Sequence, residues 1–165
     1  MSCEICPILA NPSEEEVKLR LAEGAFWRFT LRGNDQSLLG TTFATAKRHV
    51  SSLGELHVSE WQEFAVMNSN LEIAIKQAFG AQVINTSCLM NLAFKPDTSS
   101  TPKPHVHWHI KPRYASPVEV PGIDQSFIDP NFGQYLRGDH PRRPLDIEES
   151  LIVANIIKGH MPAGY

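Results

Sequence analysis

The chain has 165 residues, of which 42% are hydrophobic, and a formal net charge of −3, as expected for one globular domain. This charge and a pI near 6.1 argue against broad binding to nucleic acid polymers, which usually requires a basic surface. No run of 18 apolar residues is present, so neither a transmembrane helix nor a membrane partner is expected. Three cysteines and no visible signal peptide predict a cytoplasmic protein without a disulfide framework.

The N-terminal stretch contains Cys3-x-x-Cys6, a spacing that suits a zinc site or a redox pair. A redox motif of this kind normally starts a helix, whereas here Pro7 follows at once and a helical pattern begins only at Ser13. Two cysteines supply half of the ligands of a structural zinc. The alternatives are therefore a site completed by other residues and two free, reduced cysteines.

Helix and strand signals follow in turn. Ser13 and three glutamates after it are typical of a helix N-terminus, and we expect this helix to run to residue 22 or 23. Residues 25–31 and 41–46 alternate as strands, separated by turn residues.

A long helix is expected within residues 56–80, with a capping box at Ser59 and Gln62 and Gly80 at its end. Its apolar residues should cover the sheet. Residues 82–86 and 88–94 are predicted to be strands, and residues 95–103 a polar loop.

Residues 104–114 (PHVHWHIKPRY) are the most informative stretch. Three histidines alternate with Val106, Trp108 and Ile110, which is the period of a β-strand, so the imidazoles share one face and the apolar side chains the other. The three are His105, His107 and His109. Such a row could be a half-buried structural feature, could bind a metal through two neighbouring rings, or could provide a nucleophile. One zinc ion cannot easily take all three rings, because the outer two lie about 13 Å apart.

This stretch resembles the signature of the histidine triad (HIT) family, in which three histidines alternate with apolar residues. Residues 39–50 are similar to the family's strand and its Lys-Arg-His exit, Cys3-Glu4-Ile5-Cys6 to the cysteine pair of zinc-carrying members, and residues 88–91 to the strand before the triad. The resemblance implies an α+β fold, a HIT-like antiparallel sheet of about five strands with one long helix packed across it. It also implies a homodimer.

We expect residues 1–115 to form the HIT-like domain and residues 116–165 to form a C-terminal extension packed on the same domain. The extension should be irregular up to residue 145 and then form a short helix from Asp146 to Lys158, ending at Gly159.

The resemblance also implies site residues. Cys3, Cys6, His49 and His105 would bind a structural Zn²⁺. His107 would attack a nucleotide phosphate and form a nucleotidyl-histidine, oriented by the carbonyl of His105, while His109 would hydrogen-bond the phosphate or the departing oxygen. The implied function is a nucleotide hydrolase or nucleotidyl transferase, acting on a dinucleoside polyphosphate or phosphoramidate. The alternatives are a non-catalytic nucleotide-binding or regulatory protein, and a zinc protein in which the histidines serve only a metal.

The substrate-binding residues are less clearly indicated. The resemblance implies that Asn91 lies near the phosphate. Four further residues could donate hydrogen bonds to it or form a solvated loop: Lys95, Ser99, Ser100 and Thr101.

The sequence departs from many family members in four ways. Thr41 replaces a fourth histidine, and Ser100-Thr101 replaces a glycine-glutamine pair before the triad. Lys111 replaces an apolar residue of the signature, and residues 31–34 lack an acidic residue that often holds the ribose. Arg113 could reach a phosphate, but a salt bridge is the preferred interpretation.

Overall fold

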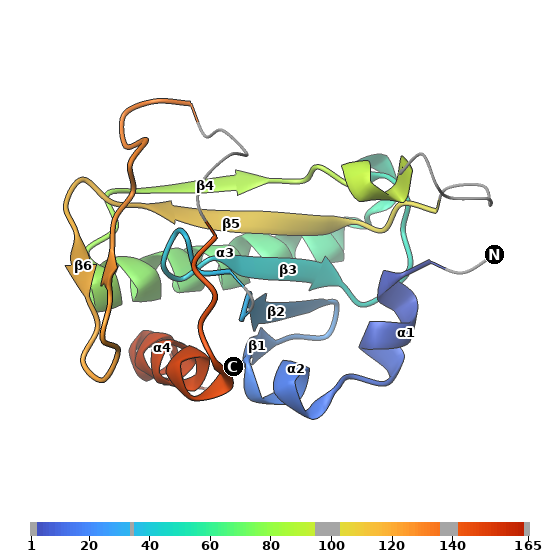
Figure 1. Ribbon diagram of the computed structural model, residues 1–165. Coiled ribbons are helices and arrows are strands. Elements are labelled where there is room, and N and C mark those ends of the chain that lie inside the picture. The colour runs from blue at the N-terminus through green and yellow to red at the C-terminus, as the bar shows by residue number, and fades with distance from the viewer. Residues whose placement is uncertain (1–2, 34, 95–102, 136–141, 164–165) are drawn as a thin grey trace.

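The computed structural model describes residues 3–33, 35–94, 103–135 and 142–163 (Figure 1). Its centre is an antiparallel sheet of five strands in the order β1-β2-β3-β5-β4. The strands are β1 (Arg20–Glu23), β2 (Trp27–Leu31), β3 (Thr42–Ala46), β4 (Val83–Ser87) and β5 (His107–Arg113). The predicted α+β fold, with about five antiparallel strands and one long helix, is confirmed.

Helix α3 (Val58–Phe79) covers one face of this sheet and runs behind β3 and β5 in Figure 1. In β2 the side chains that point to this helix are buried, because alternate side chains of a strand share one face; they are Trp27, Phe29 and Leu31. Trp27 lies 5.0 Å from the ring of Phe64 in α3, and its Nε1–H donates to the carbonyl of Glu60 at 2.7 Å. The ring of Trp108 stacks on Phe64 at 5.0 Å. The opposite face of the sheet therefore remains for the histidines.

The N-terminal helix is shorter than predicted. Helix α1 (Ile5–Ala10) was not expected, and α2 (Glu14–Lys18) ends before β1 begins at Arg20. The prediction of a helix to residue 22 or 23 was wrong, because β1 pairs with β2 and buries Leu21 and Ala22 in the core. Sheet pairing thus overrides the local helical preference.

Two further boundaries differ from the prediction. Helix α3 begins one residue after His57, whose backbone N–H donates to Glu60 at 2.7 Å, so the expected capping box at Ser59 and Gln62 was wrong. Leu53–Glu55 forms the short 3₁₀ helix η1. The strand predicted at residues 88–94 was also wrong: Met90 has a left-handed φ of 51° and Asn91–Phe94 forms the 3₁₀ helix η2, which an extended strand cannot include.

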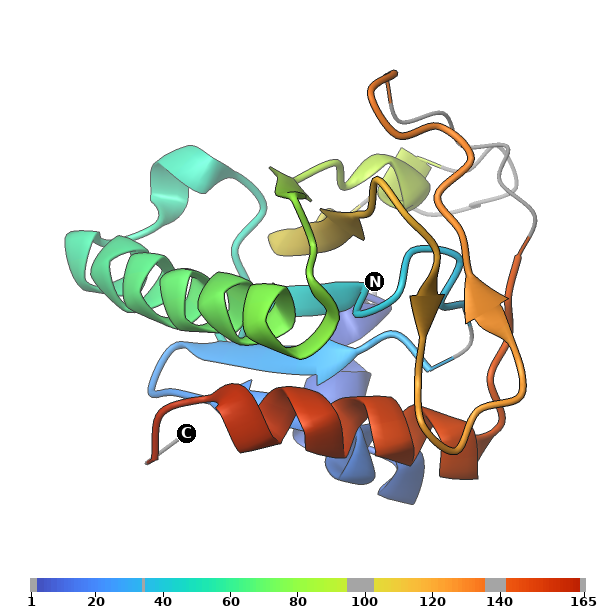
Figure 2. The ribbon, with the colours of Figure 1, turned by 90° about the vertical axis from the view of Figure 1, so that its left-hand side faces the viewer.

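After β5 the chain forms a small hairpin of β6 (Val118–Glu119) and β7 (Ser126–Phe127), which was not predicted. Helix α4 (Ile147–His160) is capped by Asp146 as expected and ends one residue beyond Gly159. It packs against α3 and β1 (Figure 2). Within the described ranges, no helix is both long and apolar enough to cross a membrane.

Candidate active site and metal centre

The histidines lie on the face of the sheet opposite α3. Val106 and Ile110 are fully buried and Trp108 is half-buried on the helix side, in agreement with the predicted alternation. The rings of His107 and His109 have centroids 5.0 Å apart and are half-buried. His105 precedes the first residue of β5 and is buried. The ring of His105 thus lies in the interior, whereas the rings of His107 and His109 are partly accessible.

A hydrogen bond fixes the tautomer of His107. Its Nδ1–H donates to the backbone carbonyl of His105 at 2.8 Å, the contact expected from the resemblance. A carbonyl oxygen only accepts, so the proton must lie on Nδ1 whenever the ring is neutral. The lone pair of Nε2 is then bare and available for attack on an electrophile.

His109 is held as a neutral ring. Burial, followed by the charges of His107, Lys111 and Arg32, lowers its pKa to about 4. Phe43, its partner across the strands, contacts it edge-on with ring centroids 5.0 Å apart. At neutral pH this ring can therefore donate one hydrogen bond and accept another, but it brings no positive charge.

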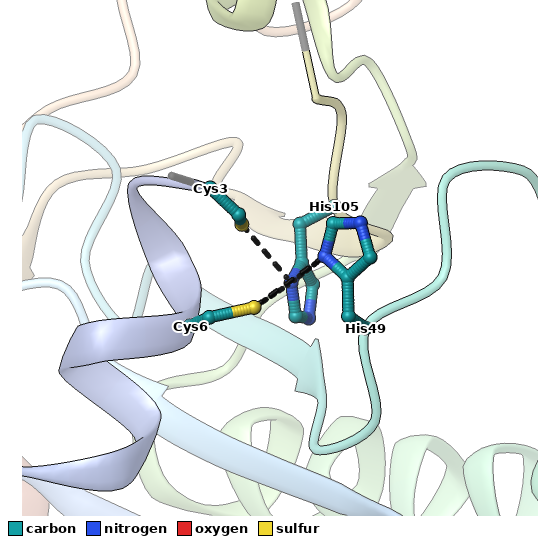
Figure 3. Close-up of side chains that lie close together, drawn as sticks. All are labelled: Cys3, Cys6, His49 and His105. Atoms are coloured by element: carbon teal, nitrogen blue, oxygen red, sulfur yellow. Dashed lines mark hydrogen bonds between the residues drawn. The ribbon is translucent and has the colours of Figure 1, made fainter. Parts of the chain in front are cut away.

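The four predicted metal ligands are brought together from three parts of the chain (Figure 3). Their ligand atoms all lie within 4.8 Å of one another. Cys3 Sγ lies 3.4 Å and Cys6 Sγ 3.5 Å from His105 Nδ1, and His49 Nδ1 lies 3.3 Å from His105 Nδ1. A tetrahedral Zn²⁺ with Zn–S near 2.3 Å and Zn–N near 2.1 Å separates its ligand atoms by about 3.4–3.8 Å. The donor set therefore fits a structural zinc.

The surroundings of His105 add to this fit. Its Nε2–H donates to the carbonyl of Ala46 at 2.7 Å, which leaves Nδ1 deprotonated and directed at the cysteines. Burial lowers the pKa of His105, and the charges of His49 and His107 lower it further. A neutral imidazole is the form that binds a metal. All four positions belong to the protein, so a metal held here has no open coordination site for water or substrate.

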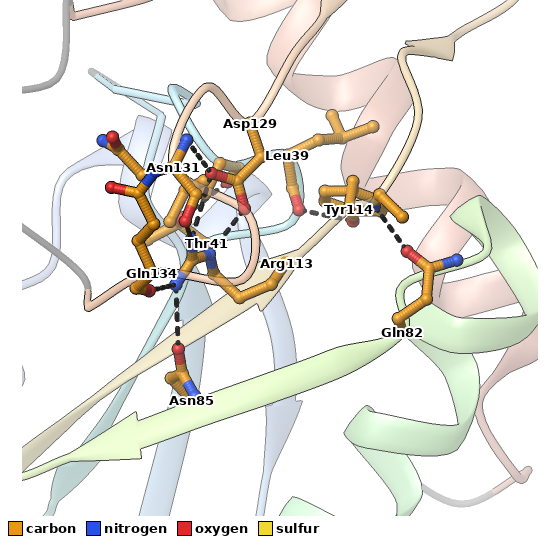
Figure 4. A network of polar contacts seen from close by, with 11 residues as sticks. Leu39, Thr41, Gln82, Asn85, Arg113, Tyr114, Asp129, Asn131 and Gln134 are labelled. Atoms are coloured by element: carbon orange, nitrogen blue, oxygen red, sulfur yellow. Dashed lines mark hydrogen bonds and ion pairs between the residues drawn. The ribbon is translucent and has the colours of Figure 1, made fainter.

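The end of the sheet face beyond Lys111 is covered by the C-terminal segment (Figure 4). Arg113 forms a buried ion pair with Asp129 at 2.5 Å and also donates to the carbonyl of Asn131. The preferred interpretation of Arg113 as a salt-bridge residue is confirmed. This guanidinium is consequently committed to the fold.

The predicted phosphate-binding residues lie partly outside the residues that the structure describes. Lys95, Ser99, Ser100 and Thr101 lie outside the described residues. Asn91 begins η2 instead of a strand.

No sequence pattern indicates a role for Phe43 or Arg32, yet both face His109 or its neighbours. Alternation in residues 41–46 places Phe43 on the face opposite Ala44, but only the strand register brings it beside His109.

No family model matches this chain, and no curated protein matches it. Solved structures do. A hypothetical histidine triad nucleotide-binding protein from Sulfolobus tokodaii is 18% identical with a TM-score of 0.64, over 96% of this chain and 91% of that one. A zinc-bound histidine triad family protein from Mycobacterium smegmatis is 21% identical with a TM-score of 0.56, over 95% and 94%. Plasmodium falciparum diadenosine triphosphate hydrolase is 14% identical with a TM-score of 0.54, over 89% and 76%.

These likenesses show that the chain has the histidine triad fold. The row of histidines at the start of β5 and just before it agrees with the family resemblance.

Proposed function

We propose that this protein is a nucleotide hydrolase or nucleotidyl transferase that acts on a nucleoside phosphate through a covalent nucleotidyl-histidine at His107. The observation that carries the proposal is the 2.8 Å hydrogen bond from His107 Nδ1 to the carbonyl of His105, which leaves Nε2 as a neutral nucleophile on an open sheet face. The substrate class is a dinucleoside polyphosphate or a phosphoramidate. The shared fold with a diadenosine triphosphate hydrolase supports this choice.

The reaction has two halves. In the first, His107 Nε2 forms a bond to the α-phosphorus, and the bond from phosphorus to the leaving oxygen or nitrogen breaks with its electron pair. The leaving group is protonated from solvent. In the second, water attacks the same phosphorus, the N–P bond breaks, the electron pair returns to Nε2, and the water's proton goes to solvent. Each half replaces one bond to phosphorus by another.

The neighbouring groups have separate tasks in this scheme. His109 hydrogen-bonds the transferred phosphate or the departing oxygen, and His105 orients His107 through its backbone. Additional phosphate contacts are proposed for five residues near the triad in sequence: Asn91, Lys95, Ser99, Ser100 and Thr101. Because phosphoryl transfer depends mainly on positioning and charge stabilisation, these donors set the rate as much as the nucleophile does.

The decisive experiment incubates the protein with diadenosine triphosphate or adenosine 5′-phosphoramidate labelled at the α-phosphate. The reaction is quenched rapidly with an alkaline denaturant, because the N–P bond of a nucleotidyl-histidine is labile in acid. Label should remain covalently attached to the wild-type chain and be absent from His107→Asn. That variant should lose several orders of magnitude in kcat while still binding AMP. His109→Asn should lose about 10²–10³-fold, the scale of one lost hydrogen-bond donor in the transition state. His160→Asn, at the exposed end of α4, is the control.

Two rival functions make different predictions. A non-catalytic nucleotide-binding or regulatory protein, which Thr41 in place of a fourth histidine favours, would bind AMP but never trap label. A zinc-only protein would do neither. Wild-type turnover by His107→Asn would refute the covalent mechanism.

We propose that Cys3, Cys6, His49 and His105 hold a structural Zn²⁺. Support comes from the ligand distances above and from the zinc-bound neighbour of the same fold. Purified protein should contain one zinc per chain by elemental analysis, and Cys3→Ser should lose zinc and stability. Cys88→Ser should keep the metal, because Cys88 is not part of the group. Absence of zinc from protein made with ample zinc would overturn this assignment.

Since a zinc site needs reduced thiolates, we also propose that the protein is located in the cytoplasm.

We further propose a homodimer formed through α3 and the edge strand β4. Val66 and Ile73 lie two turns apart on the exposed face of α3 and are 55% and 50% exposed. Strand β4 follows α3 in the chain, is outermost in the sheet, and exposes Val83. An open edge next to exposed apolar side chains favours pairing with a second copy. Light scattering should report a dimer for wild type and for the control Ile8→Asp, and a monomer for Ile73→Asp. A monomeric wild type would refute the dimer.

A further inference from the structure

Two cations lie in one cross-strand row beside His109. Lys111 is two residues beyond His109 on β5, so both side chains point to the open face. Arg32 directly follows β2, and its backbone N–H donates to the carbonyl of Thr41 at 2.9 Å. Since Thr42 pairs with Ile110, the same register places Thr41 opposite Lys111. Arg32 and Lys111 therefore flank the small Thr41 from the two neighbouring strands.

The position of Arg32 is fixed by its loop. Gln36 is fully buried and its side chain donates to the carbonyls of Arg32 and Thr41, at 2.6 and 3.2 Å. The guanidinium carbon lies 5.7 Å from the ring centroid of Phe43, the residue that contacts His109. The aromatic ring thus holds the cation near the triad.

The charges of this row are not balanced. Asp35 forms an ion pair with Arg32 at 3.3 Å and is the carboxylate that acts on Lys111. Among the residues that the structure describes, two cations and one carboxylate leave one excess positive charge in this row. Lys111 is half-buried, and within the described ranges its ammonium group forms no ion pair or hydrogen bond. Burial and the nearby Arg32 lower the pKa of Lys111. An amine in this environment is stabilised when an anion binds beside it.

We propose that Arg32 and Lys111 form a second anion subsite beside His109, and that the substrate carries another phosphate group in addition to the one that His107 attacks. This rests on the proposed function. The strand rise puts the Cα atoms of His107 and Lys111 about 13 Å apart, so one small molecule can reach both. A substrate with several phosphates is therefore preferred to a phosphoramidate with only one.

The second phosphate can come from a polyphosphate chain or from a phosphorylated sugar hydroxyl. Calorimetric titration with AMP, ADP and 3′-phosphoadenosine 5′-phosphate distinguishes them. We expect wild type to bind at least one of the two doubly phosphorylated probes about 10-fold or more tightly than AMP, and the preferred probe identifies the source.

Arg32→Gln and Lys111→Gln should each reduce that preference to 3-fold or less and leave the affinity for AMP unchanged. Arg32→Lys, which keeps the charge, should retain most of that preference. Lys18→Gln, an exposed lysine of α2, is the control for loss of one charge. Thermal unfolding checks that each variant is folded.

Equal affinity of wild type for all three probes overturns this inference. So does an equal loss of AMP binding in the glutamine variants, since the cations would then serve the attacked phosphate. Turnover of the phosphoramidate without a preference for a second phosphate refutes the subsite and leaves the proposed function intact. Failure to bind AMP at all, with no trapped label, refutes both.

Discussion

Asp129→Asn should destabilise the protein by about 3 kcal/mol. The side chains of Arg113 and Asp129 are 6% and 0% exposed, and two hydrogen bonds join them, at 2.5 and 3.2 Å. The substitution keeps the shape of the carboxylate but removes its charge, which leaves a buried guanidinium without its counter-ion. Breaking a buried pair from one side typically costs about 3–5 kcal/mol. Arg113 retains the neutral oxygens of Asn85, Asn131 and Gln134, so the lower end of that range applies.

Urea unfolding followed by tryptophan fluorescence measures this loss, because Trp27 and Trp108 both pack on Phe64 in the core. The metal content must be the same in all samples, since a ligand bound to the native state adds to stability. Asp124→Asn, an exposed carboxylate in the same segment, is the matched control and should change stability by less than about 0.5 kcal/mol.

The double variant Arg113→Met/Asp129→Leu should lose less than Asp129→Asn alone, because no unpaired charge remains buried. If Asp129→Asn behaves like Asp124→Asn, the ion pair does not hold the C-terminal segment on the sheet, and the assignment of Arg113 to the fold is wrong.

Three other substitutions or conditions give definite expectations. The pKa of His109 in the folded protein is about 4, below its ordinary value of 6.5, so the unfolded chain binds more protons between these two pH values. The contribution of His109 to the free energy of unfolding should therefore be complete above pH 6.5 and be lost as the pH falls to 4. The urea midpoint of His109→Asn should not show this pH dependence. Gly40 has a φ of +82°, so Gly40→Ala should cost about 1–2 kcal/mol, whereas Gly159→Ala, within α4 and with open space around it, should stabilise by about 0.5 kcal/mol in thermal unfolding. Trp27→Phe removes the hydrogen bond to Glu60 and leaves a small cavity, and should cost about 1–2 kcal/mol in urea unfolding.

The parts of the fold that the sequence predicted well are those in which one local pattern decides the structure. Strict alternation around the triad places Val106 and Ile110 in the core and the histidines on the opposite face. Helix α4 is capped by Asp146, whose side chain accepts from Glu149 in the first turn. In both cases residues a few positions apart carry the whole signal.

The predictions failed where distant residues decide. Leu21 belongs to β1 because β2 offers a pairing edge, which no local pattern of residues 13–23 reveals. The partner of Arg113 comes from a segment without periodicity, and Phe43 reaches His109 only through the register of β3 and β5. The candidate ligands of the metal group were named through a family resemblance, since spacing alone indicates only Cys3 and Cys6.

His105 serves two parts of the molecule at once. Its ring joins residues that lie far apart in the sequence, with Cys3 102 positions away, and its backbone carbonyl accepts the Nδ1 proton of His107. Because the ring and the carbonyl belong to one residue, a backbone movement that shifts the ring against Cys3 also shifts the acceptor of His107. The contact with the N-terminal segment and the tautomer of His107 are therefore coupled through a single residue. If His107 is the nucleophile that we propose, a change at Cys3 should alter its reactivity.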